Sequence, residues 1–466
     1  MPFDMPLAEE IWGAKYRFRS ADAEDADLSA TLDRVAEAVA RAEKPSVRKQ
    51  WRTRFREALS NFRFIPAGRI LAGAGTGRNV TLFNCFVMGT IPDNLPGIFE
   101  HLREAAVTLQ QGGGVGMDFS TIRPAGAAVR GVGAEASGPL SFMDTWDAMC
   151  RTIMSAGQRR GAMMGCLRID HPDIEAFIDA KRDGVRLRNF NLSVLVTDAF
   201  MEAVQGDAEF ELVHRAEPGA AQKEQGAYRR ADGLWVYRKA RARELWDQIM
   251  RSTYDHAEPG VLFLDRINND NNLGYCETIT ATNPCAEQPL PPYGCCCLGS
   301  IDLTRFIKNP FEDNAEFDRA AFAEVARVAT RMLDNVLDVT VWPLPQQQEE
   351  ARSKRRVGLG FTGLGDALVM LNLRYDTQPA RDMARQISEL MRDTAYEASV
   401  ELARERGAFP LFNADLYLSG QNFASRLPTP LKDRIRAHGL RNSHLLSIAP
   451  TGTISLAFAD NASNGI

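Results

Sequence analysis

The sequence predicts an α/β protein with a parallel core sheet, and two observations support this fold class. Segments with strand character alternate with segments of helical periodicity, for example a helix expected near Pro172 before strands expected at residues 191–196 and 260–264. This alternation is typical of parallel strands joined by helical crossovers. The composition, 45% hydrophobic and 25% charged residues, is that of a globular protein with a large core.

A helical region is expected at the N-terminus, residues 1–62, followed by one main domain at residues 63–466. From Ser29 to Phe62 apolar residues recur at helical spacing among many charged ones. We expect this region to act as a scaffold on the main domain. Further helices are predicted at residues 98–109, 315–339 and 378–406, and a strand at residues 80–88.

The net charge of −5 excludes a general nucleic-acid-binding protein, which would carry a basic excess. No apolar run approaches the length of a membrane span, and the N-terminus MPFDMPLAEE lacks the character of a signal peptide. We therefore expect a cytoplasmic protein. Eight cysteines in such a chain favour a reversible redox pair over a disulfide framework. The sequence lacks the paired C-x-x-C spacing that would indicate a zinc site.

The stretch Asn-Pro-Cys-Ala-Glu-Gln, residues 283–288, places an amide, a thiol and a carboxylate at alternate positions. On an extended backbone Asn283, Cys285 and Glu287 would face one cavity. A carboxylate disfavours a neighbouring thiolate, so this pattern suits a neutral thiol that exchanges a hydrogen atom while the carboxylate takes a proton. Prolines at positions 284 and 289 lack backbone N–H groups and predict an ordered loop or tip.

Taken alone, Cys285 is equally well explained as a small core residue. The run Cys295-Cys296-Cys297 favours a functional role, because three adjacent thiols are hard to explain by packing alone. Together, Asn-Pro-Cys-Ala-Glu and the following Pro-Tyr-Gly-Cys-Cys-Cys-Leu-Gly-Ser resemble the radical-cysteine finger loop of adenosylcobalamin-dependent ribonucleotide reductases. Five more segments agree in order: residues 11–17, FIPAGRILAGAGT at 64–76, NCFV at 84–87, QGGGVGMDFS at 111–120 and PTGTI at 450–454.

This resemblance implies a ten-stranded α/β barrel of two five-stranded halves, with the finger loop inserted through its centre. In the family, further barrel strands follow the segment that here ends at Ile466. We therefore expect the last strands to be missing from this chain, which would then be a fragment, a split subunit completed by a second chain, or a truncated protein.

The implied reaction reduces ribonucleotides, expected to be diphosphates, to 2′-deoxyribonucleotides for DNA synthesis. By resemblance, Cys285 carries a thiyl radical generated with adenosylcobalamin, Glu287 takes the 3′-hydroxyl proton and Asn283 orients the hydroxyls. Cys85 and Cys296 would be the reducing pair, since Cys296 lies eleven residues after Cys285 as the family spacing requires. A thioredoxin-type reductant would reset the pair.

Substrate and effector contacts are also carried over by resemblance. The effector, a deoxynucleotide, would lie between helices of residues 137–165 at a homodimer interface, near Arg159, Arg160 and Gly161. From the residues alone, this basic stretch is equally a solvated turn, and the glycines at 112–116 are equally a helix C-cap. The substrate contacts would be Asn84, Gly114, Pro450, Thr451, Gly452, Thr453 and Ile454.

The residues 137–165 include Phe142, Trp146, Met149, Ile153 and Met154, which form an apolar stripe at helical spacing. Such a stripe predicts one buried face of a helix.

Three alternatives remain open at the level of sequence. One is a reductase whose radical comes from a separate subunit, and another is a non-catalytic nucleotide-binding fragment. The third is a nicotinamide dehydrogenase based on Gly358 to Gly363, which matches G-x-G-x-x-G. Because the polar residues 352–356 precede this motif, we interpret it as a tight turn that packs a helix closely.

Overall fold

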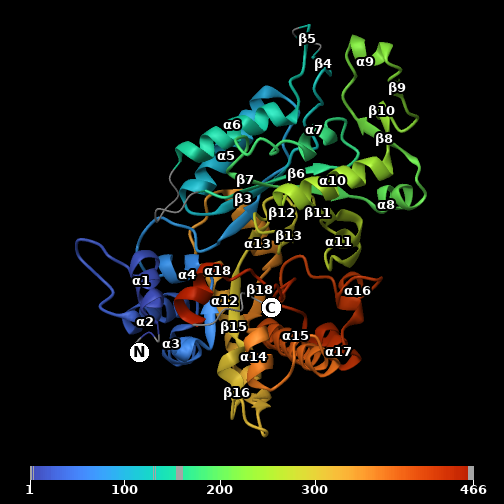
Figure 1. The fold of residues 1–466 in the computed structure, drawn as a ribbon. Helices are drawn as coiled ribbons and strands as arrows, with labels where there is room; N and C mark the ends of the chain where they lie inside the picture. Colours follow the sequence, from blue (N-terminus) through green and yellow to red (C-terminus); the bar gives the residue numbers. More distant parts are fainter. Residues whose placement is uncertain (1–2, 4, 130, 132, 154–160, 460–466) are drawn as a thin grey trace. The chain divides into compact units, whose positions relative to one another are not determined.

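The computed structural model describes residues 3, 5–129, 131, 133–153 and 161–459, which divide into two compact units (Figure 1). The first unit combines Met1–Asn84 with Cys295–Ile466, and the second unit is Cys85–Gly294. In the described part of the chain, no helix is long and apolar enough to cross a membrane.

The core of the second unit is a parallel sheet of five strands in the order β11-β7-β6-β3-β2. The residues of β3, β6 and β7 are mostly apolar and buried, whereas those of β11 are half-buried or exposed. This sheet confirms the predicted α/β class. The strands are β2 (Cys85–Val87), β3 (Gly114–Asp118), β6 (Met163–Arg168), β7 (Phe190–Val196) and β11 (Gly260–Phe263).

Helices and a small sheet complete the second unit, and α5 and α6 lie side by side (Figure 1). The polar segment from Pro218 to Arg230 contains helix α9 and strand β9 of that antiparallel sheet, ordered β8-β10-β9. The main elements are α5 (Leu95–Gln110), α6 (Pro139–Thr152), α7 (Ile174–Ile178), α8 (Asp198–Gln205), α10 (Ala242–His256), α11 (Leu264–Asp270), β4 (Ala128–Val129), β5 (Ala134–Glu135), β8 (Glu209–His214), α9 (Ala220–Glu224), β9 (Tyr228–Arg229) and β10 (Trp235–Arg241).

The predicted stripe on α6 is only partly correct. Trp146 is buried and packs edge-on against Phe119, but Phe142 and Met149 are half-buried. The helix ends at Thr152, so Ile153 lies beyond it, and Met154 lies outside the described residues. The buried face of the helix is rotated relative to the predicted stripe, because Met143, one turn before Trp146, packs against Gly165 of β6. The buried residues of the helix are Pro139, Leu140, Met143, Trp146, Asp147 and Cys150.

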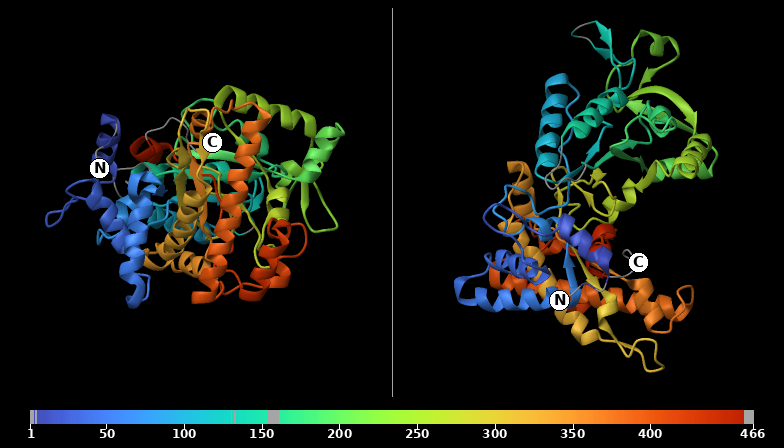
Figure 2. Two further views of the ribbon diagram at one scale, coloured as in Figure 1. Left: turned by 90° about the horizontal axis from the view of Figure 1, so that it is seen from below. Right: turned by 60° about the vertical axis from the view of Figure 1, so that its left-hand side comes forward.

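The first unit contains a three-stranded sheet ordered β1-β15-β18, in which β15 and β18 are parallel. The two longest helices, α12 and α15, lie side by side (Figure 2). Their bounds confirm the helices predicted at 315–339 and 378–406. The elements are α1 (Pro6–Lys15), α2 (Leu28–Ala40), α3 (Pro45–Leu59), β1 (Phe64–Pro66), α4 (Gly68–Gly73), β14 (Cys295–Cys296), β15 (Leu298–Asp302), α12 (Arg319–Val339), α13 (Pro345–Lys354), β18 (Gly358–Thr362), α14 (Leu364–Met370), α15 (Gln378–Arg406) and α17 (Thr429–His438).

The strand predicted at 80–88 forms only over Cys85–Val87. The residues before it run irregularly, because their backbone is bound by a side chain instead of a neighbouring strand. The Leu82 N–H donates to the Thr340 hydroxyl, at 2.9 Å.

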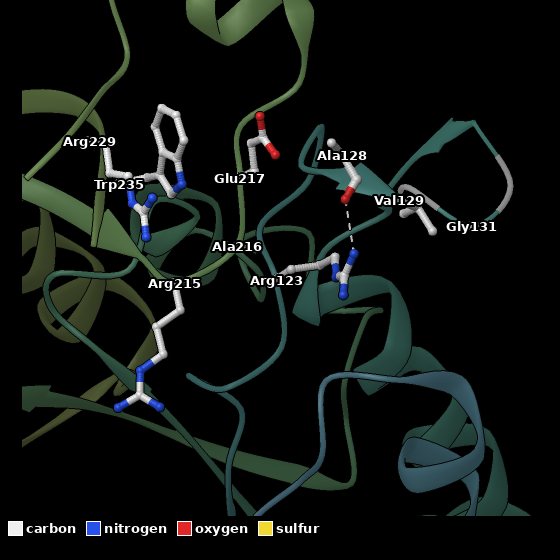
Figure 3. Close-up of a pocket in the computed structure, with 9 residues that line it drawn as sticks. All are labelled: Arg123, Ala128, Val129, Gly131, Arg215, Ala216, Glu217, Arg229 and Trp235. Atoms are coloured by element: carbon white, nitrogen blue, oxygen red, sulfur yellow. Dashed lines mark hydrogen bonds between the residues drawn. The ribbon is translucent and has the colours of Figure 1, made fainter. Parts of the chain in front are cut away.

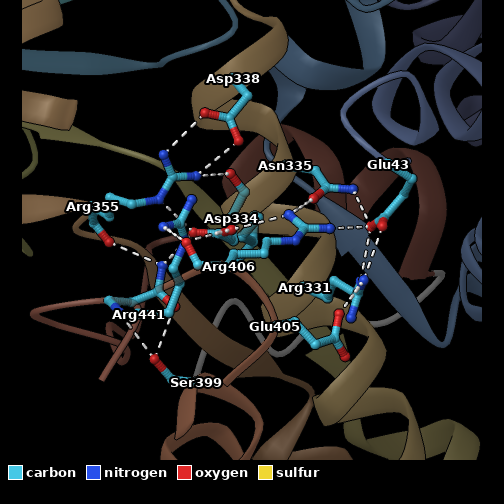
Figure 4. Close-up of polar contacts among 12 residues, drawn as sticks. Glu43, Arg331, Asp334, Asn335, Asp338, Arg355, Ser399, Glu405, Arg406 and Arg441 are labelled. Atoms are coloured by element: carbon cyan, nitrogen blue, oxygen red, sulfur yellow. Dashed lines mark hydrogen bonds and ion pairs between the residues drawn. The ribbon is translucent and has the colours of Figure 1, made fainter. Parts of the chain in front are cut away.

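A buried ionic network ties the N-terminal helices to α12 and α15 (Figure 4). Glu43, in the turn between α2 and α3, accepts hydrogen bonds from Arg331 at 2.8 Å and from Asn335 at 2.9 Å, and pairs with Arg406. Burial alone would raise the pKa of Glu43, but these donors lower it to about 2. The Glu43 side chain is 1% exposed, so its charge depends on these partners.

A second carboxylate of the network, Asp334 on α12, is fully buried. It binds the Arg355 guanidinium at 2.8 Å and the Asn442 amide at 2.8 Å. The neighbouring arginines hold the pKa of Asp334 below its usual value despite burial. The network therefore joins five separate segments of the first unit: the turn between α2 and α3, α12, the end of α13, α15 and the segment at Asn442.

Candidate active site

The Asn283–Gln288 segment is the tip of a hairpin in the second unit. Strands β12 (Ala281–Thr282) and β13 (Pro289–Leu290) pair antiparallel below the tip. The chain reverses within the tip, where the Ala286 N–H donates to the Asn283 carbonyl at 3.0 Å and Ala286 has a φ of 65°. The predicted loop or tip is confirmed, whereas the extended backbone that would align alternate side chains is wrong.

The turn still brings two of the three predicted groups together. The Asn283 side-chain amide donates to Glu287 Oε2 at 2.6 Å, and Asn283 Oδ1 accepts from the Gln288 N–H at 3.0 Å. Cys285 is exposed at the tip, not enclosed in the cavity that the sequence predicts. Burial raises the pKa of Glu287, although the Asn283 hydrogen bond opposes the rise. The tip thus presents an exposed thiol beside a carboxyl group that readily holds a proton.

The stem of the hairpin lies against the parallel sheet at a glycine. A Cβ atom at Gly116 of β3 would lie 1.8 Å from the Thr282 carbonyl oxygen, so only glycine fits there. Cys166 of β6 contacts the same residue through a hydrogen bond with the Thr282 backbone. Burial raises the pKa of Cys166 to about 12, so this thiol is inert. The role of Gly116 was not predicted, since the glycine-rich segment gave no sign of which glycine meets the hairpin.

Cys85 and Gly114 face each other as Cα partners on β2 and β3 of the second unit. Cys85 is 8% exposed. The preceding glycine turn is the helix C-cap that the residues alone suggested: Gly112 has a φ of 101° and its N–H donates to the Leu109 carbonyl. Gly114 itself belongs to the strand and, as a glycine, places no side chain beside its Cα partner Cys85.

The three adjacent cysteines are buried in the first unit. The Cys297 thiol donates to the Leu333 carbonyl of α12 at 3.4 Å, which identifies Cys297 as a packing residue. Burial raises the pKa of Cys295, and Glu350 acts in the same direction. Cys296 lies between them in β14. Its pairing with Cys85, which belongs to the other unit, stays a prediction.

The 450–454 loop, which is expected to contact the substrate, lies beside two other segments of the first unit. A Cβ atom at Gly68, where α4 begins, would lie 3.2 Å from the Tyr16 ring and 3.7 Å from Ile454. Asn84 reaches the same helix, since its Oδ1 atom accepts from the Arg69 N–H at 3.4 Å. Asn84 and the 450–454 loop therefore flank the N-terminal end of α4.

The segment that leads into the 450–454 loop is mostly irregular. Only one bridge, between Leu446 and Leu359, pairs this part of the described chain with the sheet. Thr451 adopts a φ of 50° and its hydroxyl lies 3.4 Å from that of Thr362. The backbone turns into the short helix α18 (Gly452–Ile454).

Comparison with known proteins identifies the family. The description "Ribonucleotide reductase, barrel domain" matches residues 83–466, and "Ribonucleotide reductase, all-alpha domain" matches residues 4–79. This chain belongs to the ribonucleotide reductase family. The expected combination of a helical N-terminal region and an α/β barrel fold is thereby confirmed.

Individual relatives of this ribonucleotide reductase chain differ in their named class. The Vitamin B12-dependent ribonucleoside-diphosphate reductase of Mycobacterium tuberculosis is 39% identical over 429 residues, covering 91% of this chain and 56% of the relative. The protein of the same name from Thermoplasma acidophilum is 36% identical over 404 residues, 86% of this chain and 48% of the relative. The ribonucleoside-diphosphate reductase large subunit of Variola virus is 29% identical over 429 residues, 87% of this chain and 55% of the relative. The chain thus spans about half the length of the curated relatives it matches.

The glycine motif at 358–363 has no dinucleotide-binding geometry in this ribonucleotide reductase chain. The tight turn predicted there is wrong, because residues 358–362 form the buried strand β18. A Cβ atom at Gly360 would lie 2.2 Å from the Ser447 carbonyl oxygen, so this glycine admits a neighbouring backbone. Only Gly363, with a φ of 75°, forms the turn into α14. The nicotinamide alternative therefore loses its structural basis.

The predicted effector residues are only partly described. Arg159 and Arg160 lie outside the described residues. A Cβ atom at Gly161 would lie 2.6 Å from the Cys150 sulfur of α6, so this glycine is required for packing.

A separate basic pocket of about 790 Å³ lies in the second unit (Figure 3). Arg123, which pairs with Asp93 at 3.0 Å, donates to the Ala128 carbonyl at its rim. The guanidinium groups of Arg215 and Arg229 suit a phosphate-bearing ligand such as a nucleotide. Arg123 is paired with Asp93, and Lys223 lies over the Trp235 ring at 5.6 Å. Sequence reasoning missed this pocket because its lining comes from distant segments. The lining residues are Arg123, Ala128, Val129, Gly131, Arg215, Ala216, Glu217, Arg229 and Trp235.

Proposed function

We propose that this chain reduces ribonucleotides, as diphosphates, to 2′-deoxyribonucleotides for DNA synthesis, with adenosylcobalamin as cofactor. The observation that carries this proposal is the exposed Cys285 thiol at a hairpin tip where Asn283 and Glu287 share a hydrogen bond of 2.6 Å. The names of the Mycobacterium and Thermoplasma relatives support the cobalamin-dependent class. The lower identity of the viral large subunit, 29%, makes the class with a separate radical subunit the weaker alternative.

The tip residues fit such a cofactor in their chemistry. The Cys285 thiol carries the hydrogen atom that a radical cofactor would remove, and it is exposed at the tip. When bound, adenosylcobalamin supplies the radical that takes this hydrogen atom.

The remaining steps belong to the chain's own residues. Cys285, as a thiyl, removes the 3′ hydrogen of the ribose, Glu287 takes the 3′-hydroxyl proton and Asn283 orients the hydroxyl. The raised pKa of Glu287 increases its basicity for this transfer. One proton joins the departing 2′-hydroxyl to form water, and one proton and two electrons reach C2′. The Cys85 and Cys296 thiols supply these two protons and two electrons and become a disulfide, while Glu287 returns its proton to the 3′ oxygen and Cys285 returns the 3′ hydrogen.

Recognition of substrate and effector follows from the same proposal. The substrate phosphates bind residues 450–454, with Asn84 and Gly114 beside the sugar. A deoxynucleotide effector, bound through Arg159, Arg160 and Gly161, sets substrate preference in a homodimer. A thioredoxin-type protein reduces the disulfide, a second chain supplies any barrel strands that this chain lacks, and the enzyme acts in the cytoplasm.

The decisive experiment measures deoxynucleotide formation by the purified 466-residue chain with and without adenosylcobalamin. We expect product only with the cofactor, and none from Cys285→Ala. Product formed only with an added radical-generating subunit would support the other reductase class. Nucleotide binding without turnover under both conditions would support a non-catalytic nucleotide-binding chain. This is the second candidate function, and the basic pocket of the second unit favours it.

A further inference from the structure

We propose that Asn191 is a positioning residue that fixes the peptide group immediately before Cys285; this inference rests on the proposed function. The Asn191 side-chain amide donates to the Pro284 carbonyl oxygen at 2.7 Å. The two residues are 93 positions apart in the chain, and both belong to the second unit. The contact therefore joins the parallel sheet to the reactive tip.

One hydrogen bond at this carbonyl controls the placement of the thiol because the peptide unit is planar. The direction of the Pro284 carbonyl sets the plane that also contains the Cys285 nitrogen and Cα atoms. Tip residues on the other side of Cys285 are held separately, since Asn283 binds both Glu287 and the Gln288 N–H. Asn191 thus adds a tether from the sheet to the Pro284 carbonyl, a group that the side chain of Asn283 does not bind.

The platform that carries Asn191 is rigid. Asn191 lies in β7, where it is the Cα partner of Met164 in β6, and its neighbours Phe190 and Leu192 are buried. Phe190 also packs edge-on against Phe119, with ring centroids 5.9 Å apart. The Asn191 side chain is itself exposed, but its backbone is held by pairing with β6 and by its buried neighbours, so its attachment point does not depend on the tip. Asn191 is therefore suited to hold the thiol at a constant position.

The first test is hydrogen–deuterium exchange of residues 281–290 in the full chain. We expect faster exchange at the tip in Asn191→Ala. Asn191→Asp keeps the size of the side chain but sets a carboxylate against the carbonyl, so it should exchange at least as fast as the alanine variant. The matched control is Asn189→Ala, which loses a hydrogen bond to Asp147 at 3.0 Å and should leave the tip unchanged.

The second test separates positioning from general damage. In the active enzyme, Asn191→Ala should lower kcat by about 10- to 100-fold, as expected for a misplaced reacting group, while KM for the nucleotide stays constant. Asn191→Asp should lower kcat further, whereas a packing role would make the isosteric variant the milder one. Equal tip exchange in all variants, or a milder Asn191→Asp, would overturn the proposal. Turnover by Cys285→Ala would instead overturn the proposed function, while the exchange result would still decide the role of Asn191.

Discussion

Replacing Glu43 by glutamine removes a buried charge from the network that joins the N-terminal helices to α12 and α15. The pKa of this carboxyl falls from an ordinary value of 4.5 to about 2 in the folded protein. At 1.36 kcal/mol per pKa unit, this shift corresponds to about 3 kcal/mol of stability. A similar loss is expected when one partner of a buried ion pair is removed, because the Arg331 and Arg406 charges lose part of their compensation.

The stabilisation by Glu43 depends on pH, and the lowered pKa determines the direction of this dependence. Because the folded pKa is the lower one, the contribution of Glu43 is fully present above about pH 4.5 and is lost as the pH falls towards 2. Urea unfolding should therefore show Glu43→Gln to be less stable by about 3 kcal/mol at neutral pH, with the difference shrinking below pH 4.5. The control is Glu324→Gln, which removes a carboxylate that is 53% exposed and should cost less than about 1 kcal/mol. Equal losses in the two variants, or a Glu43 effect that does not change with pH, would refute the reasoning.

Three further predictions concern the second unit and the triple cysteine. Gly116→Ala should displace the hairpin and lower turnover by about 100-fold. The control is Gly13→Ala, whose added Cβ meets nothing within 4 Å, and equal turnover in the two variants would contradict the prediction. Cys297→Ala should cost about 1–2 kcal/mol in urea unfolding but leave turnover intact, and loss of turnover in a folded variant would show that Cys297 takes part in the chemistry. Arg215→Ala should weaken nucleotide binding in the basic pocket by about 10-fold in calorimetry, and unchanged affinity would exclude a phosphate contact there.

Patterns local in the sequence predicted most of the fold. The alternation of strands and helices predicted a parallel sheet but not its strands β3 and β6, and helical periodicity predicted α15 to the residue and α12 to within four residues. The prolines at 284 and 289 correctly predicted a tip. The pairing of Asn283 with Glu287 was expected for the wrong reason, since a turn and not strand alternation brings them together.

Features that depend on contacts between distant segments could not be predicted. Arg355 and Arg356 made the segment before Gly358 look like a surface stretch, yet both are buried. Arg355 is neutralised by Asp334 and Asp338, which lie 21 and 17 positions away in the chain. The strand after them was therefore mistaken for a turn. The contact of Asn191 with the hairpin tip was missed for the same reason, because it joins elements that no local pattern connects.

The most direct test of the central claim is a single-turnover reaction without external reductant, followed by mapping of the cysteines by mass spectrometry. We expect a stoichiometric amount of deoxynucleotide, a new disulfide between Cys85 and Cys296, and neither in Cys285→Ala. Deoxynucleotide formed by Cys285→Ala, or product accompanied by free thiols at both Cys85 and Cys296, would contradict this claim.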